Sequence, residues 1–197
     1  MSPIRVVVAA VAGGTVMFVW GAIAHMVLPI GEMGIKELPA EEVLLPAIGQ
    51  HVTEPGFYMF PGIGAAGATD EAMEAWQRKW EAGPRGVLIA DPGPGEFMPP
   101  TQLGVEWGAD VLAAAVLAIV LGWLPCTFMG KTLVAGALGL FAWLTVDVSY
   151  WNWYKFPPEL VLGGLIDQAI GWLGAGAVIA AIVRGRPCRG DAEPAPA

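Results

Sequence analysis

The chain has 197 residues, of which 55% are hydrophobic and 14% are charged, whereas soluble domains carry about 25% charged residues. This composition argues against an ordinary soluble globule. A net charge of −8 without a basic cluster argues against nucleic acid as a partner. Two cysteines are too few for a disulfide scaffold or a four-cysteine zinc site.

Four apolar segments are each long enough to cross a bilayer as a helix, which takes about 20 residues. They cover residues 6–28, 111–130, 132–154 and 160–183. Lys131 lies between the second and third segments, so we expect those two helices to form a tight hairpin. The sequence thus predicts an all-α membrane protein with four transmembrane helices.

The first segment has an alternative interpretation as a cleaved signal peptide. Arg5 precedes the apolar run, and Ala22-Ile23-Ala24 resembles an A-x-A cleavage site. The apolar run continues past that site to Leu28, which favours an uncleaved helix over residues 1–28.

The loop at residues 29–106 carries twelve acidic and four basic side chains. Residues 56–60 and 86–90 are short apolar runs that predict strands. Between them, Thr69 is suited to cap a helix that begins at Asp70 and stops at Gly83-Pro84. We therefore expect a small α+β cap between the first and second transmembrane helices.

The loop also contains a G-x-G-x-x-G pattern at residues 62–67. In a dinucleotide-binding unit this pattern directly follows a strand and opens a helix. Here Pro61 intervenes and the helix signal begins only at Thr69. We interpret the glycines as a connector and predict no nucleotide.

The basic residues predict the orientation in the membrane, because cytoplasmic segments are enriched in Lys and Arg. They place both termini in the cytoplasm, residues 29–106 outside, and Cys126 and Cys188 on the reducing side, so no disulfide is expected. Residues 107–183 hold helices two to four, and residues 184–197 form a predicted disordered tail. The basic residues that set this orientation are Arg5, Lys131, Arg184, Arg186 and Arg189, and the aromatic residues expected to form an outer interfacial belt are Trp107, Tyr150, Trp151, Trp153, Tyr154 and Phe156.

A group of polar residues falls inside the apolar segments, close to their outer ends. Such residues usually face the bundle interior, because charge in hydrocarbon is costly. The group could relay protons, hold a divalent metal or bind a polar substrate. In the alternative interpretation its members only orient or cap helices. They are His25, Asp110 at the start of the second helix, Asp147, Asp167 and Gln168.

Catalytic signatures are absent from the sequence. It has no C-x-x-C, H-E-x-x-H, G-x-S-x-G or Walker pattern. We therefore predict no cofactor, no dedicated metal site and no catalytic residue, and favour a protein that is not an enzyme.

Three stretches carry a family resemblance: WGAIAHMVLPIGEMG at 20–34, EPGFYMFPG at 54–62 and GPRGVLIADPGPGEFMP at 83–99. Together they resemble an uncharacterised group of bacterial four-helix inner-membrane proteins. The resemblance implies a bacterial inner membrane, with residues 29–106 in the periplasm. It implies no activity and no site residues.

Two functions fit these features. The first is an accessory, assembly or stabilising subunit of a larger membrane complex, such as a respiratory or photosynthetic one, with lipid and protein partners. The alternative is a small membrane enzyme or a proton- or metal-handling protein that uses the outer His/Asp cluster.

Overall fold

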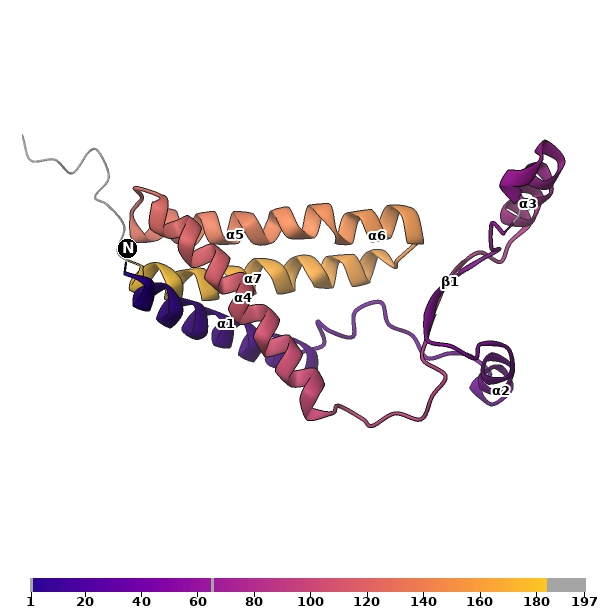
Figure 1. Ribbon diagram of the computed structural model, residues 1–197, viewed down its shortest axis with the longest axis horizontal. Coiled ribbons are helices and arrows are strands. Elements are labelled where there is room, and N and C mark those ends of the chain that lie inside the picture. The colour runs from indigo at the N-terminus through magenta and orange to yellow at the C-terminus, as the bar shows by residue number, and fades with distance from the viewer. Residues whose placement is uncertain (1, 65, 184–197) are drawn as a thin grey trace, which may run out of the picture. The chain divides into compact units, whose positions relative to one another are not determined.

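The computed structural model describes residues 2–64 and 66–183 (Figure 1). The chain divides into two compact units. Among the described residues, the first unit, which we call the bundle, comprises residues 2–35, 98–152 and 156–183. The second, which we call the loop unit, comprises Lys36–Phe97 together with Trp153–Lys155.

The bundle consists of long apolar helices. Four segments of it are long and apolar enough to cross a membrane, and α5 and α6 together form one of them. The predicted fold class is confirmed in its main features: four candidate membrane helices, with a small α+β segment between the first two. The helices are α1 (Pro3–Met26), α4 (Pro100–Trp123), α5 (Phe128–Thr145), α6 (Asp147–Tyr154) and α7 (Pro158–Ile182).

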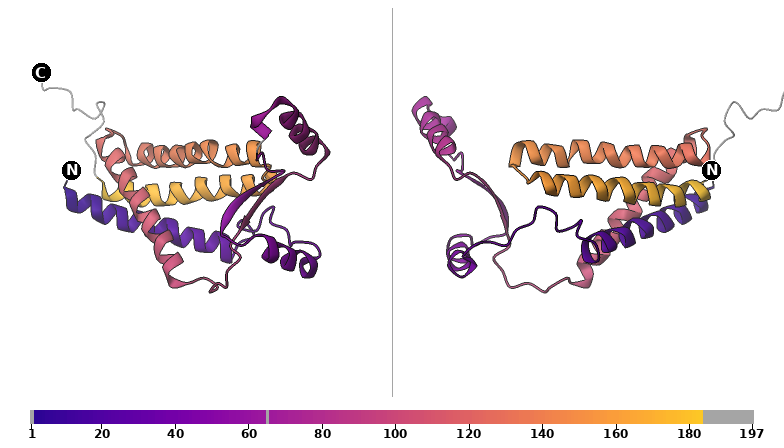
Figure 2. Two further views of the ribbon diagram at one scale, coloured as in Figure 1. Left: turned by 45° about the vertical axis from the view of Figure 1, so that its right-hand side comes forward. Right: turned by 180° about the vertical axis from the view of Figure 1, so that it is seen from behind.

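Helix α7 is central to the packing of the bundle. It contacts α5 along its length and also packs on α1, while α4 packs mainly on α1 (Figure 2). The sequence predicts a tight hairpin of the second and third membrane helices, but α4 and α5 do not pack against each other in this way. The connection at residues 124–127 is short, but α4 then crosses the bundle obliquely and barely touches α5 (Figure 1).

Small residues explain these pairings, because they let helix backbones approach closely. Gly14 of α1 lies directly against the main chain of Val111 in α4. On the other side of the bundle, Gly176 of α7 lies against Ala135 of α5. Small residues thus lie at the closest contacts of both helix pairs.

The second membrane helix begins earlier than predicted. Helix α4 starts at Pro100, where proline is favoured at the first helical position, and it ends before Pro125. The predicted range of 111–130 began only after the last charge, so it excluded Glu106 and Asp110, which both lie inside the helix. Asp110 is therefore in the middle of α4 and does not open it.

Lys131 also differs from its predicted place. It lies in the first part of α5 rather than in a turn, and only 2% of it is exposed. Its ammonium donates a hydrogen bond to the carbonyl oxygen of Val183, 3.1 Å away, at the C-terminal end of α7. This contact joins α5 and α7 at the end of the bundle where α1 begins.

The loop unit contains the strand–helix–strand order that the sequence predicts. Strands β1 (Gly56–Phe60) and β2 (Gly86–Ala90) and helix α3 (Asp70–Ala82) have the predicted bounds. The hydroxyl of Thr69 accepts a hydrogen bond from the amide of Ala72 at 3.2 Å, as expected of its capping role.

Two further elements of the loop unit, a helix and a single turn, were not predicted. Helix α2 (Glu41–His51) forms despite Pro46 inside it, and a single turn, η1 (Ala66–Ala68), precedes α3. The strands pair antiparallel, with Gly56 opposite Ala90 and Phe60 opposite Gly86. A dinucleotide-binding unit has parallel strands instead, so the surroundings of the glycine pattern differ from that unit. The predicted tail at 184–197, with Cys188, lies outside the described residues.

Candidate functional site

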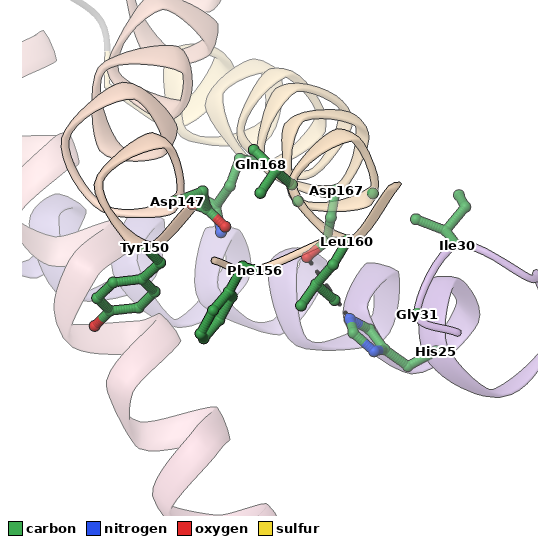
Figure 3. A pocket seen from close by; sticks show the side chains of 12 residues that line it. His25, Ile30, Gly31, Asp147, Tyr150, Phe156, Leu160, Asp167 and Gln168 are labelled. Atoms are coloured by element: carbon green, nitrogen blue, oxygen red, sulfur yellow. Dashed lines mark ion pairs between the residues drawn. The ribbon is translucent and has the colours of Figure 1, made fainter. Parts of the chain in front are cut away.

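A pocket of about 310 Å³ lies in the bundle, at the end where α1 finishes and α7 begins (Figure 3). Its walls come from the end of α1 and the chain just after it, from α6, and from the first half of α7. The polar residues that line it are His25, Asp147, Tyr150, Asp167 and Gln168, and the apolar ones include Ile30, Phe156, Leu160 and Val161.

Asp167 is a largely buried acidic group of the pocket. Its side chain is 17% exposed, against 57% for His25. Oδ2 of Asp167 lies 3.8 Å from Nε2 of His25, an ion-pair distance that is too long for a hydrogen bond. Oδ1 is buried and has no hydrogen-bond partner among the described residues. Buried polar atoms usually have a partner, so this oxygen is available to a donor that enters the pocket.

Contacts between α1 and α7 bring His25 to Asp167. The indole Nε1 of Trp20 donates to the main-chain carbonyl of Asp167 at 3.1 Å. Next to it, the side chains of Met17 and Trp20 pack directly on Gly171 of α7. These contacts hold the last turn of α1 beside the polar part of α7.

The chain after α1 folds back over His25. The amide of Gly31 donates to the carbonyl oxygen of Ala24 at 3.1 Å. A side chain at position 31 would collide with the imidazole of His25. Gly31 is thus required for the close approach of the main chain to the His25 side chain.

The opposite wall of the pocket comes from the junction of α5 and α6. The carboxylate of Asp147 lies directly against Gly164 of α7. Nearby, Nε1 of Trp143 donates to the carbonyl oxygen of Val161 at 2.7 Å and so ties α5 to α7. The side-chain oxygen of Gln168 accepts from Nε1 of Trp172 at 2.9 Å, which fixes the orientation of its amide.

The structure gathers four of the five residues that the sequence singled out. His25, Asp147, Asp167 and Gln168 line one pocket, whereas Asp110 on α4 does not line it. The reason is the early start of α4, which places Asp110 in the helix interior rather than at its end. The side chain of His25 is 57% exposed, which differs from the expectation that polar residues in the apolar segments face the bundle interior.

Two aromatic residues of the pocket were interpreted from the sequence only as part of an interfacial belt. Tyr150 and Phe156 line the pocket, and their ring centroids are 5.3 Å apart. The spacing of Asp147 and Tyr150, three residues apart on one helical turn, is a signal that would have placed Tyr150 near the acid. Nothing in the sequence pattern marks Gly31.

The charged groups are not arranged for a metal ion. Within the described residues, no three His, Cys, Asp or Glu side chains come close enough together to hold one. The metal interpretation of the cluster therefore lacks a set of ligands in this part of the chain. The lining has two carboxylates and one histidine, and no Lys or Arg belongs to it.

Comparison of the chain with family models, with curated proteins and with solved structures gave no match. The fold defines a membrane protein with four candidate spans and, at one end of its bundle, a pocket lined by both polar and apolar residues. The resemblance to a bacterial inner-membrane group stays a prediction.

We expect His25 and Asp167 to be energetically coupled. Asp167→Leu should lower the stability of the bundle less in a His25→Leu background than alone, because the contact between the two side chains is already lost in that background. The coupling should be about 0.5–1 kcal/mol, since His25 is largely exposed. Unfolding of both single variants and the double variant in detergent measures it.

The matched control pairs His25→Leu with Asp110→Leu, which lies outside the pocket, and additive effects are expected there. Additive effects for His25 and Asp167 as well would mean that the two side chains do not interact.

Proposed function

We propose that the chain is a multi-pass protein of a bacterial inner membrane, with both termini in the cytoplasm and the loop unit in the periplasm. The distribution of basic residues supports this orientation. Arg5 lies near the start of α1, and Lys131 lies near the start of α5. Basic side chains are retained on the cytoplasmic side of bacterial membranes.

We further propose that the protein is an accessory or stabilising subunit that binds a partner protein through its loop unit. One observation carries this proposal: the loop unit has ordered helices and strands, but none of its residues whose burial is described is buried. None of residues 36–64 and 67–97 is buried, although Met59 and Ile89 of the hairpin are large and apolar.

Physical chemistry explains why such a unit needs a partner. A two-stranded hairpin is marginally stable by itself in water. Exposed apolar clusters mark interaction sites more often than free surface. In the observed register Phe57 lies opposite Ile89, and Met59 lies opposite Val87, so these side chains share one face of the sheet. A partner protein that covers this face would supply the missing burial.

The charge of the loop unit indicates the kind of surface that fits it. Residues 36–97 carry ten acidic and four basic side chains. An excess of negative charge disfavours anionic lipid and favours a protein surface with Lys and Arg around an apolar centre.

A photo-reactive amino acid at position 89 tests the proposal in native membranes. Ile89 is 69% exposed, so the probe replaces a side chain without disturbing a core. We expect a crosslinked adduct with one defined protein, identified by mass, and co-migration of that protein with the chain after gentle solubilisation.

Leu112 of α4 provides the matched control, because it is 70% exposed but lies within a candidate membrane span. A probe there should crosslink lipid and not the same protein. If the chain migrates alone as a monomer and position 89 gives no protein adduct, the accessory function is wrong.

A further inference from the structure

The pocket in the bundle has the size and the mixed lining of a small-molecule site. Its volume of about 310 Å³ lies at the lower end of the range for ligand pockets, about 300–1,000 Å³. One part of the wall is apolar and aromatic, with Phe156, Tyr150 and Leu160. The other part carries the carboxylates of Asp147 and Asp167, as Figure 3 shows.

Asp167 determines what kind of group the pocket accepts. Its buried Oδ1 has no donor among the described residues, and leaving a buried acceptor without a hydrogen bond is unfavourable. Its other oxygen faces His25 at 3.8 Å without a hydrogen bond. The favoured ligand therefore brings an N–H or O–H donor to this carboxylate.

The charge of the residues around Asp167 narrows the chemical class of the ligand further. Asp147 lines the same cavity, and no Lys or Arg does, so the pocket repels anions and attracts cations. A bare metal ion would need three or more protein ligands close together, and the described residues provide no such group. Tyr150 and Phe156 also line the cavity, and aromatic rings attract organic cations.

We propose that this pocket binds a small protonated primary amine, with its ammonium group at Asp167 and Asp147 and its short apolar part against Phe156 and Leu160. The ammonium supplies both the positive charge and the N–H donors that Oδ1 of Asp167 lacks. This site is separate from the proposed partner surface of the loop unit and does not depend on it.

A primary ammonium could come from a free amine or from the headgroup of phosphatidylethanolamine. The two sources share the chemistry that the pocket recognises and differ in whether a lipid must be present. The experiment therefore includes one arm without aminolipid and one arm with it.

Calorimetric titration of the full-length protein with n-butylammonium, in micelles without aminolipid, tests the proposal. We expect saturable binding, and binding weaker by about tenfold or more for tetramethylammonium, which has the charge but no N–H donor. Asp167→Asn should weaken butylammonium binding by a similar factor. Asp91→Asn, the same exchange on an exposed acid of the loop unit, is the matched control and should leave it unchanged.

A second variant guards against a folding defect in Asp167→Asn. Leu160→Trp keeps both carboxylates but fills part of the cavity, so it should abolish binding of butylammonium. In lipid nanodiscs, weaker butylammonium binding with phosphatidylethanolamine than with phosphatidylcholine would identify the lipid headgroup as the source. Equal binding in the two lipids would identify a free amine.

Three results would overturn the proposal: no saturable binding of butylammonium to the unmodified protein, equal affinity for tetramethylammonium, or unchanged affinity in both Asp167→Asn and Leu160→Trp. Each would mean that the carboxylate and its cavity do not select an amine.

Discussion

Replacing Lys131 with Met is expected to lower the free energy of unfolding of the bundle by about 1–3 kcal/mol, the cost of leaving a buried hydrogen-bond partner unsatisfied. Lys131 is almost fully buried, and its ammonium donates to the carbonyl oxygen of Val183 at 3.1 Å. Met has a similar length and fills the same space, so the change removes the charge and the donor without opening a large cavity.

The position of the contact adds to the expected effect. Val183 directly follows α7, and the C-terminal end of a helix carries partial negative charge that a cation stabilises. Lys131→Met should therefore loosen the junction of α5 and α7. The measurement is unfolding in detergent, followed by circular dichroism during titration with a denaturing surfactant.

Lys36→Met is the matched control for this prediction. Lys36 is an exposed lysine of the loop unit, so its replacement removes the same charge but no buried contact. We expect no change in stability for that variant. An unchanged unfolding transition in Lys131→Met would show that the contact between α5 and α7 contributes nothing.

Gly14→Ala is expected to destabilise the bundle by about 1–3 kcal/mol, the usual cost of adding volume at a tightly packed contact. A β-carbon at position 14 would collide with the main chain of Val111 in α4. A main chain cannot move aside like a flexible side chain, so α1 and α4 would have to separate.

Gly21→Ala in the same helix is the matched control. A β-carbon there meets no atom within 4 Å, and alanine favours a helix over glycine by about 1 kcal/mol. We expect this variant to be as stable as the original or more stable. Thermal unfolding of the two variants side by side tests the prediction, and equal melting temperatures would argue against the close contact of α1 and α4.

The local elements could be predicted from the sequence because their signals are local. The bounds of β1, α3 and β2 follow from apolar runs, the capping Thr69 and the stop at Gly83-Pro84. The start of α4 could not be predicted from hydropathy alone, because Glu106 and Asp110 interrupt the apolar run without ending the helix. Helix α2 was not predicted, since it contains Pro46 in its interior, where proline normally disrupts a helix.

The candidate site was predicted only in part. Depth in the apolar segments and the polar residue types identified His25, Asp147, Asp167 and Gln168, and these residues line one pocket. Asp110 does not line the pocket. The sequence predicts it at the start of the second membrane helix, but α4 begins ten residues earlier, at Pro100. Gly31 and the wall formed by Phe156 depend on how the chain folds back after α1 and before α7, which no local pattern encodes.

The sequence by itself determined that four helices of this chain are apolar enough for a membrane, because the length and hydropathy of a segment are properties of that segment alone. The tertiary structure decided which helices pair. Helix α5 packs on the span that follows it, α7, and barely on the span that precedes it, α4, because close approach depends on small residues that face each other across space, as Gly176 and Ala135 do. The same pairing brings acids from α6 and α7 together beside His25, and this convergence creates the pocket.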